Sequence, residues 1–187
     1  MTVNKFGVVG PAVPPGLLAD RIVGVQGSRI VTVSSNAHRY RARIDFERFG
    51  MEQGRSQSAA YGRSKLANLL FTHELQRRLG AAGSPTTVLA AHPVWAETEI
   101  LRHFRGIGFI EPLIGPLRNS AATGALAILR AVTDPAASGS EFYGSDGWFE
   151  MRGHPVLVGS SDRSHDSELQ RQVWRASEDV TGVTFPI

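Results

Sequence analysis

The chain has 187 residues, of which 42% are hydrophobic and 20% charged, a composition typical of one globular domain with a sizeable core. It contains no cysteine, which excludes disulfides, thiol chemistry and zinc sites built on thiolates, and fits a cytoplasmic protein. The net charge is only +3 with the basic residues spread along the chain, and no apolar run reaches the ~18–20 residues that cross a bilayer. We therefore expect no nucleic-acid partner and no membrane partner.

The first part of the chain predicts a short helix and then a buried strand. Residues 1–15 contain three prolines and are expected to be irregular, and apolar residues at helical spacing predict a helix over 16–25. The run RIVTVS over 29–34 is rich in β-branched residues, and a short apolar run between turn signals is typical of a parallel strand buried on both faces. The strand ends at Ser35, and polar residues at the carboxyl end of such a strand lie where open α/β sheets bind ligands.

A long helix and a second strand follow. After a polar, irregular stretch over 36–57, leucines recur at helical spacing through 58–79, with Gly80 in the position that often ends a helix. The run TTVLAA over 86–91 predicts a second buried strand, which ends at His92. A strand, a helix and a second strand in this order form a βαβ unit, so both polar strand ends are expected at the same edge of a parallel sheet.

The second half of the chain predicts one more strand and three helices. The elements are a short helix over 99–104, a small-residue helix over 120–133, a short strand over 141–144 and a last helix over 164–179, capped by Ser164 or Asp166. Alternating strands and helices predict an α/β fold, and we expect residues 1–187 to form a single domain.

Tyr61 and Lys65 are four residues apart on the long helix, and therefore lie one above the other on the same face. A phenol titrates near pH ~10, and a nearby ammonium lowers that pKa because it favours the phenolate. A tyrosine tuned in this way can protonate a carbonyl oxygen or take the proton of an alcohol. The spacing alone also fits an ordinary surface pair, so the surrounding sequence has to decide.

Four segments together resemble one enzyme family. They are SRIVTVSSNAHR over 28–39, AYGRSKLANLLFTHELQRRL over 60–79, AAHP with Thr98 over 90–98, and the tail over 164–186. With them the chain resembles the short-chain dehydrogenases/reductases, in the branch of retinol-dehydrogenase-like bacterial oxidoreductases. The resemblance implies a partial Rossmann-like, doubly wound fold, namely its C-terminal portion with about three parallel strands and flanking helices.

The resemblance also implies hydride transfer between NAD or NADP and a lipophilic alcohol or carbonyl compound as the small-molecule partner. Ser35 would hydrogen-bond the substrate oxygen. Tyr61 would be the general acid/base, and Lys65 would lower the pKa of Tyr61 and hold the nicotinamide ribose. Cofactor contacts are implied for Tyr61 and Lys65 and for three residues after the second strand, Pro93, Val94 and Thr98.

The sequence departs from the family pattern in three places. No glycine-rich turn of the kind that approaches a dinucleotide pyrophosphate occurs near the start of the chain. The catalytic asparagine of the family has no counterpart beyond Asn4, which precedes a proline-rich stretch. Val94 replaces the glycine that lets the backbone approach the cofactor, and the bulky Trp95 follows it. The chain therefore resembles the C-terminal half to two-thirds of the family fold.

These departures leave three interpretations open. The first is an NAD(P)-dependent oxidoreductase. The second is a catalytically impaired, truncated remnant that acts as a binding or interaction module. The third is a structural partner that completes another chain through an open strand edge. Association into a homo-oligomer would cover the same edge.

Other candidate sites have simpler interpretations. The six histidines show no spacing typical of metal ligands, so no metal site is predicted. Ser164, His165 and Asp166 are contiguous and cannot converge as a hydrolase triad, so we interpret them as a helix cap. Five aromatic residues could either line a lipophilic pocket or pack in the core: Phe142, Trp148, Phe149, Trp174 and Phe185.

Overall fold

The computed structural model describes residues 13–40, 42–49, 57–93, 121–150 and 152–187. Its strands form one sheet in chain order, β1 (Arg29–Val33), β2 (Thr87–Ala91), β3 (Phe142–Ser145) and β4 (Pro155–Leu157). β1, β2 and β3 are parallel, whereas β4 runs antiparallel to β3. The predicted α/β fold with three parallel strands is confirmed, and β4 is an addition that no pattern in the sequence predicts.

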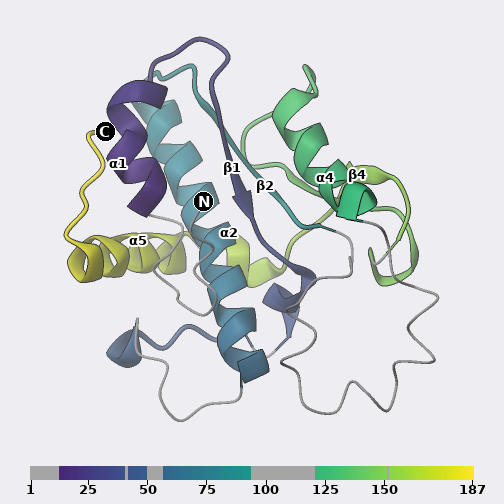
Figure 1. Cartoon of the computed structure of the whole chain (residues 1–187). Helices are drawn as coiled ribbons and strands as arrows, with labels where there is room; N and C mark the ends of the chain where they lie inside the picture. The colour runs from purple at the N-terminus through teal and green to yellow at the C-terminus, as the bar shows by residue number, and fades with distance from the viewer. Residues whose placement is uncertain (1–12, 41, 50–56, 94–120, 151) are drawn as a thin grey trace.

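Helices cover both faces of this sheet. The described residues form α1 (Val13–Ile22), α2 (Gln57–Ala81), α4 (Ala121–Thr133) and α5 (Ser167–Thr181). In Figure 1, α1, α2 and α5 lie on one side of β1 and β2, and α4 lies on the other. The described ranges also contain four short 3-10 turns: η1 (Asn36–Arg39), η2 (Phe46–Arg48), η6 (Trp148–Glu150) and η7 (Asp162–His165). Three layers around a parallel sheet are the doubly wound, partial Rossmann-like architecture.

Alternation of side chains along the strands divides the core into two parts. Ile30 of β1 and Val88 of β2 pack in one cluster with residues of α1, α2 and α5. Leu89 and Ala91 of β2 pack in another cluster, against Ala127 of α4. Because both faces of β2 are covered, the strand is apolar along most of its length, as is typical of parallel sheets.

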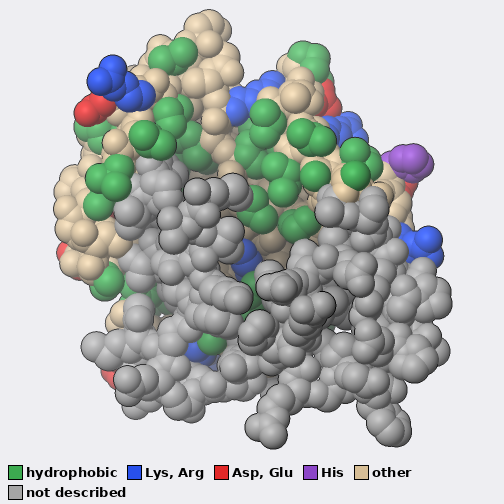
Figure 2. Space-filling model, viewed as in Figure 1, with side chains coloured by type: hydrophobic (Ala, Val, Ile, Leu, Met, Phe, Trp, Pro, Cys, Tyr) green, Lys and Arg blue, Asp and Glu red, His purple; other side chains and the backbone are tan. Residues whose placement is uncertain are grey.

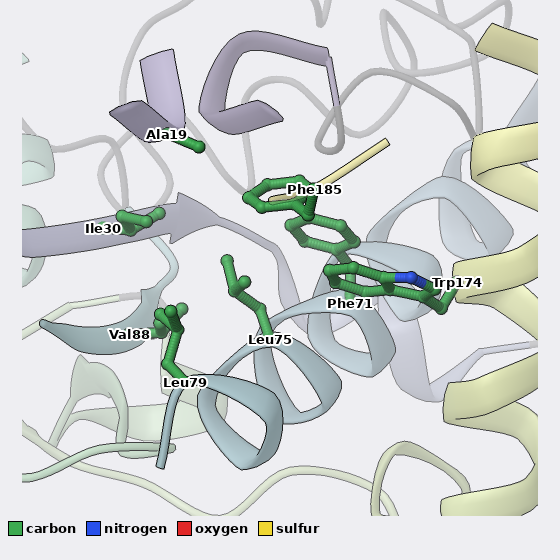
Figure 3. Close-up of a cluster of buried hydrophobic side chains, with 8 residues drawn as sticks. All are labelled: Ala19, Ile30, Phe71, Leu75, Leu79, Val88, Trp174 and Phe185. Carbon is green, nitrogen blue, oxygen red and sulfur yellow. The ribbon is translucent and has the colours of Figure 1, made fainter. Parts of the chain in front are cut away.

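Trp174 of α5 packs against Phe71 and Phe185 at one end of the first cluster (Figure 3). The ring of Phe71 stacks on it with centroids 5.2 Å apart and an interplanar angle of 6°, and the ring of Phe185 lies 5.1 Å away. The guanidinium of Arg78 lies 4.3 Å from the indole centroid, within the range of a cation–π contact. Trp174 and Phe185 are buried, so the core interpretation is confirmed for these two aromatic residues.

The structure corrects two predicted helix boundaries in the N-terminal half of the chain, the start of α1 and the end of α2. Residues 13–15, predicted to be irregular, begin α1, because the first turn of a helix tolerates proline, whose missing N–H would have no partner there. α2 continues past Gly80 to Ala81 instead of ending before it. The left-handed residue of the following turn is Gly83, with φ of 68°.

The last helix begins at Ser167 rather than at residue 164. The carboxylate of Asp166 accepts the backbone N–H groups of Glu168 and Leu169 at 2.9 and 3.1 Å, which satisfies two donors of the first turn. The helix-cap interpretation is therefore confirmed, with Asp166 as the cap. The short helix predicted over 99–104 lies outside the described residues.

We predict that Trp174→Ala destabilises the protein by about 3–5 kcal/mol, because it removes a fully buried ring and leaves a cavity between α2 and α5. Val180→Ala is the matched control on the same helix, since Val180 is exposed, and its effect should stay within about 0.5 kcal/mol. Urea unfolding followed by circular dichroism measures both. Equal stabilities would show that the aromatic cluster does not anchor α5.

Candidate active site

Three chain segments meet at the carboxyl edge of the parallel strands. Ser35 follows β1, His92 follows β2, and Glu150 lies in η6 shortly after β3. The backbone ladder continues one residue beyond β2, where the N–H of His92 donates to the carbonyl of Tyr143 at 2.9 Å. The expectation that the two polar strand ends share one edge is confirmed by the parallel pairing of β1 and β2.

Lys65 lies on the same face of α2 as Tyr61. Its ammonium is 5.4 Å from the centre of the Tyr61 ring and donates to the backbone carbonyl of Val33 at 3.2 Å. Burial lowers the pKa of Lys65, because the charged form is desolvated. Among the described residues, the Val33 carbonyl is the one hydrogen-bond acceptor of this ammonium, which has three N–H groups to donate.

Hydrogen bonds tie α2 to the end of β1 beside this lysine. The side-chain amide of Asn68 donates to the same Val33 carbonyl at 2.8 Å, and the hydroxyl of Ser34 donates to the carbonyl of Lys65 at 2.8 Å. Sequence reasoning missed both residues. Asn68 follows Tyr61 by seven residues, which is two helical turns, so its position on the same face is the signal that could have identified it.

The turn that carries Ser35 packs against the first turns of α2. Ser35 is the N-cap of η1 in an extended conformation, and its hydroxyl oxygen accepts the N–H of Ala37 at 3.3 Å. A Cβ at Gly62 would lie 2.8 Å from the carbonyl oxygens of Ala37 and Tyr40. Only glycine therefore allows η1 to approach α2 this closely, next to Tyr61.

A polar network joins the segments that follow β1, β2 and β3. The Nε2 atom of His92 lies 2.6 Å from a carboxylate oxygen of Glu150, whose other oxygen accepts from Arg39 at 3.4 Å. Burial opposes ionisation of Glu150, but His92 and Arg39 more than offset it and hold the pKa of the carboxyl below its usual value. Glu150 has a left-handed backbone conformation with φ of 56°, which is uncommon for a residue with a side chain.

Two buried histidines are neutral in the folded protein. His38 on η1 and His73 on α2 are 1% and 6% exposed. Burial lowers the pKa of each to about 4; a hydrogen bond to Ser35 opposes the shift at His38, and the neighbouring His165 adds to it at His73. Both rings therefore remain uncharged at neutral pH.

The structure brings together three of the predicted site residues. Ser35, Tyr61 and Lys65 all lie where η1, β1 and the first turns of α2 meet. Pro93 directly follows His92 and is exposed. Val94 and Thr98, like Asn4 and Trp95, lie outside the described residues.

The described part of the chain contains no group of three or more His, Cys, Asp or Glu residues arranged to hold a metal ion. Within the same ranges, no helix has both the length and the apolar character needed to cross a membrane.

No protein-family model matches the chain. It is similar to retinol dehydrogenase 13 of Homo sapiens, with 33% identity over 97% of this chain and 55% of that protein. It is also similar to dehydrogenase/reductase SDR family member 13 of Bos taurus, with 33% identity over 94% of this chain and 45% of that protein. A crystal structure of an uncharacterised protein from Mycobacterium paratuberculosis matches with a TM-score of 0.75 and 37% identity, over 96% of this chain and 58% of that one.

The fold and these relatives define the class of protein. Over most of its length the chain is homologous to short-chain dehydrogenases/reductases and has a fold of their type, as the segments around Ser35 and Tyr61 predicted. It spans about half the length of the curated relatives that it matches.

We predict that Gly62→Ala destabilises the protein by about 1–3 kcal/mol, because the new methyl group meets two backbone oxygens that cannot move independently of η1. Gly80→Ala is the matched control in the same helix. Nothing lies within 4 Å of a Cβ at Gly80, so this variant should gain about 0.5–1 kcal/mol from helix propensity. Urea unfolding measures both variants, and equal stabilities would refute the close contact between η1 and α2.

We predict that stability falls as the pH drops from about 6.5 towards 4. The unfolded chain protonates His38 and His73 near pH ~6.5, whereas the folded chain does so only near pH 4, so protons favour the unfolded state across this window. Each histidine should lower the free energy of unfolding at pH 5 by about 2 kcal/mol relative to pH 7.

Thermal or urea unfolding at pH 7, 6 and 5 measures this loss, in a range where most carboxyl groups stay ionised. His73→Phe should remove the contribution of His73 to the pH dependence of the free energy of unfolding, because phenylalanine does not titrate. His154→Gln, at an exposed position, is the control that should leave the slope unchanged. A stability that stays constant between pH 7 and pH 5 would contradict the prediction.

Proposed function

We propose that the chain is an oxidoreductase of the short-chain type that transfers hydride between NAD or NADP and an apolar alcohol or carbonyl compound. The observation that carries this proposal is that Ser35, Tyr61 and Lys65 lie together at the carboxyl edge of a parallel sheet. Open α/β sheets bind their ligands at this edge.

The residues present fit the sugar of a nicotinamide cofactor. The partly buried ammonium of Lys65 has one acceptor among the described residues, which would leave two N–H groups for ribose hydroxyls. Tyr61 lies beside it, and we propose further cofactor contacts at Pro93, Val94 and Thr98 after β2. When bound, the cofactor supplies or accepts the hydride.

Tyr61 is proposed as the general acid/base at the substrate oxygen. In alcohol oxidation its phenolate oxygen accepts the hydroxyl proton, and in carbonyl reduction its hydroxyl donates a proton to the oxygen. The positive charge of Lys65 stabilises the phenolate. The hydroxyl of Ser35 accepts one hydrogen bond from Ala37, so its own proton is available to bind the substrate oxygen.

The names of the relatives support a proposed substrate class. One of them is a retinol dehydrogenase, and retinol is an apolar alcohol, so we propose an apolar alcohol or the corresponding carbonyl compound for this chain. We also propose that residues 1–187 form a single domain and that the protein is cytoplasmic, since the chain has no cysteine.

An interaction module is the second candidate function. Within the described residues β1 is an edge strand, and α4 leaves Leu126, Leu129 and Val132 exposed. Figure 2 shows apolar side chains gathered on the face of the molecule that carries this helix. An unpaired strand edge and exposed apolar side chains both favour association, either with a second copy of the chain or with another protein.

Titration of the purified chain with NADH and NADPH tests the proposed function, with tryptophan fluorescence or calorimetry as the readout. The oxidoreductase proposal expects saturable binding in the micromolar range and cofactor-dependent turnover of apolar alcohols. A folded chain that binds neither cofactor at millimolar concentration would favour the interaction module. A molecular mass that rises with protein concentration would support that second candidate.

We predict that Tyr61→Phe lowers turnover by about 10²–10⁴-fold, because it removes the group that transfers the proton. Cofactor affinity should change only a few-fold, since Lys65 remains. Tyr40→Phe is the matched control, because Tyr40 is an exposed tyrosine on the neighbouring turn. Turnover of Tyr61→Phe at the level of Tyr40→Phe would exclude the acid/base role.

A further inference from the structure

We propose that His38 is a positioning residue, which holds the turn carrying Ser35 in place through its neutral tautomer with the proton on Nδ1. The effect of this device on turnover rests on the proposed function, whereas the tautomer and its two hydrogen bonds do not.

His38 makes a hydrogen bond with each of its ring nitrogens. The Nδ1 atom lies 2.7 Å from the carbonyl oxygen of Ser35, which also accepts the backbone N–H of His38 at 3.0 Å. On the other side of the ring, the Nε2 atom lies 3.0 Å from the backbone nitrogen of Ser161. The ring therefore bridges the backbone of Ser35 and a segment that is more than 100 residues away in the sequence.

The partners of the ring define its protonation state. A carbonyl oxygen can only accept, so Nδ1 has to carry a proton towards Ser35. A backbone N–H can only donate, so Nε2 has to present a lone pair towards Ser161. The neutral imidazole with the proton on Nδ1 satisfies both bonds, whereas the imidazolium would direct an N–H at the N–H of Ser161.

The surroundings keep the ring neutral and in place. His38 is 1% exposed, and the ring of Phe142 meets it edge to face at 5.6 Å and 84°. The charged or titratable groups that act on it are Arg39 on the same turn, His92 after β2 and Glu150 on η6. Arg39 and His92 oppose a positive charge on the ring and Glu150 favours one, while burial outweighs all three.

These contacts constrain the backbone of Ser35 without occupying its side chain. The carbonyl of Ser35 is fixed by His38, and η1 is fixed from the other side by its close approach to Gly62. The hydroxyl accepts only the long bond from Ala37 at 3.3 Å among the described residues, so it stays available for a substrate oxygen. A misplacement of about 1 Å at a group that contacts substrate can cost on the order of 10²-fold in rate.

The chain offers a matched control for a buried histidine. His73 is 6% exposed and remains neutral like His38, but its Nε2 atom has no hydrogen-bond partner among the described residues. It packs against His165 with ring centroids 4.8 Å apart. Loss of His73 removes a buried ring of the same kind without removing a bond to the Ser35 turn.

The test compares three variants of the full chain in cofactor-dependent turnover. His38→Phe keeps an aromatic ring against Phe142 and loses both hydrogen bonds, and we expect kcat to fall about 10–100-fold while KM for the cofactor changes less than about 3-fold. His38→Gln can donate to Ser35 and accept from Ser161, so it should restore kcat to within about 5-fold of wild type. His73→Phe should keep wild-type kcat.

Nitrogen NMR of the histidine rings in the wild-type chain gives a readout that needs neither turnover nor a variant. At pH 7 we expect protonated Nδ1 and unprotonated Nε2 at His38, and slower amide exchange at Ser161 in wild type and His38→Gln than in His38→Phe. A proton on Nε2 at pH 7 would overturn the inference, as would a folded His38→Phe chain with wild-type exchange at Ser161. If the wild-type chain shows no turnover, the proposed function fails, and the NMR result still decides the role of His38.

Discussion

The carbonyl group of Val33 is the point on which the arrangement of the candidate site depends. It is the last carbonyl of β1, and it accepts hydrogen bonds from the side chains of both Lys65 and Asn68 on α2. These bonds fix the rotation of α2 about its axis relative to the end of β1. Since Tyr61 lies one turn before Lys65 on the same face, the same bonds fix where the phenol lies relative to Ser35.

α2 can lie this close to the end of β1 only if the turn η1, which follows β1, can pack against the first turns of the helix. The absence of a side chain at Gly62 makes room for the carbonyls of η1, and His38 and the network around Glu150 hold that turn from the opposite side. Both ring nitrogens of His38 and both carboxylate oxygens of Glu150 have polar partners here, and buried polar groups that are paired in this way favour one geometry. The fold therefore supports the site through the same contacts that pack η1 against α2.

Much of the fold could be predicted because its signals are local. The buried strands over 29–34 and 86–91 and the helix over 58–79 were recognisable from apolar runs and helical spacing, and their observed limits differ by at most two residues. The limits of α1 and α5 were less accurate, because proline is tolerated in a first helical turn and because either Ser164 or Asp166 could cap the last helix. β4 was not predictable, since three residues of mixed character carry no periodic signal until β3 pairs with them.

The sequence by itself determined the order of strands and helices, the helical spacing of Tyr61 and Lys65 and the resemblance to a family, because these properties depend on neighbours along the chain. Only the tertiary structure decided that Lys65 and Asn68 share the carbonyl of Val33, that Gly62 lies against η1, and that His38 reaches Ser161. Each of these contacts joins residues from different elements. Their distance and direction follow from how the helices and the sheet pack together, which no local pattern encodes.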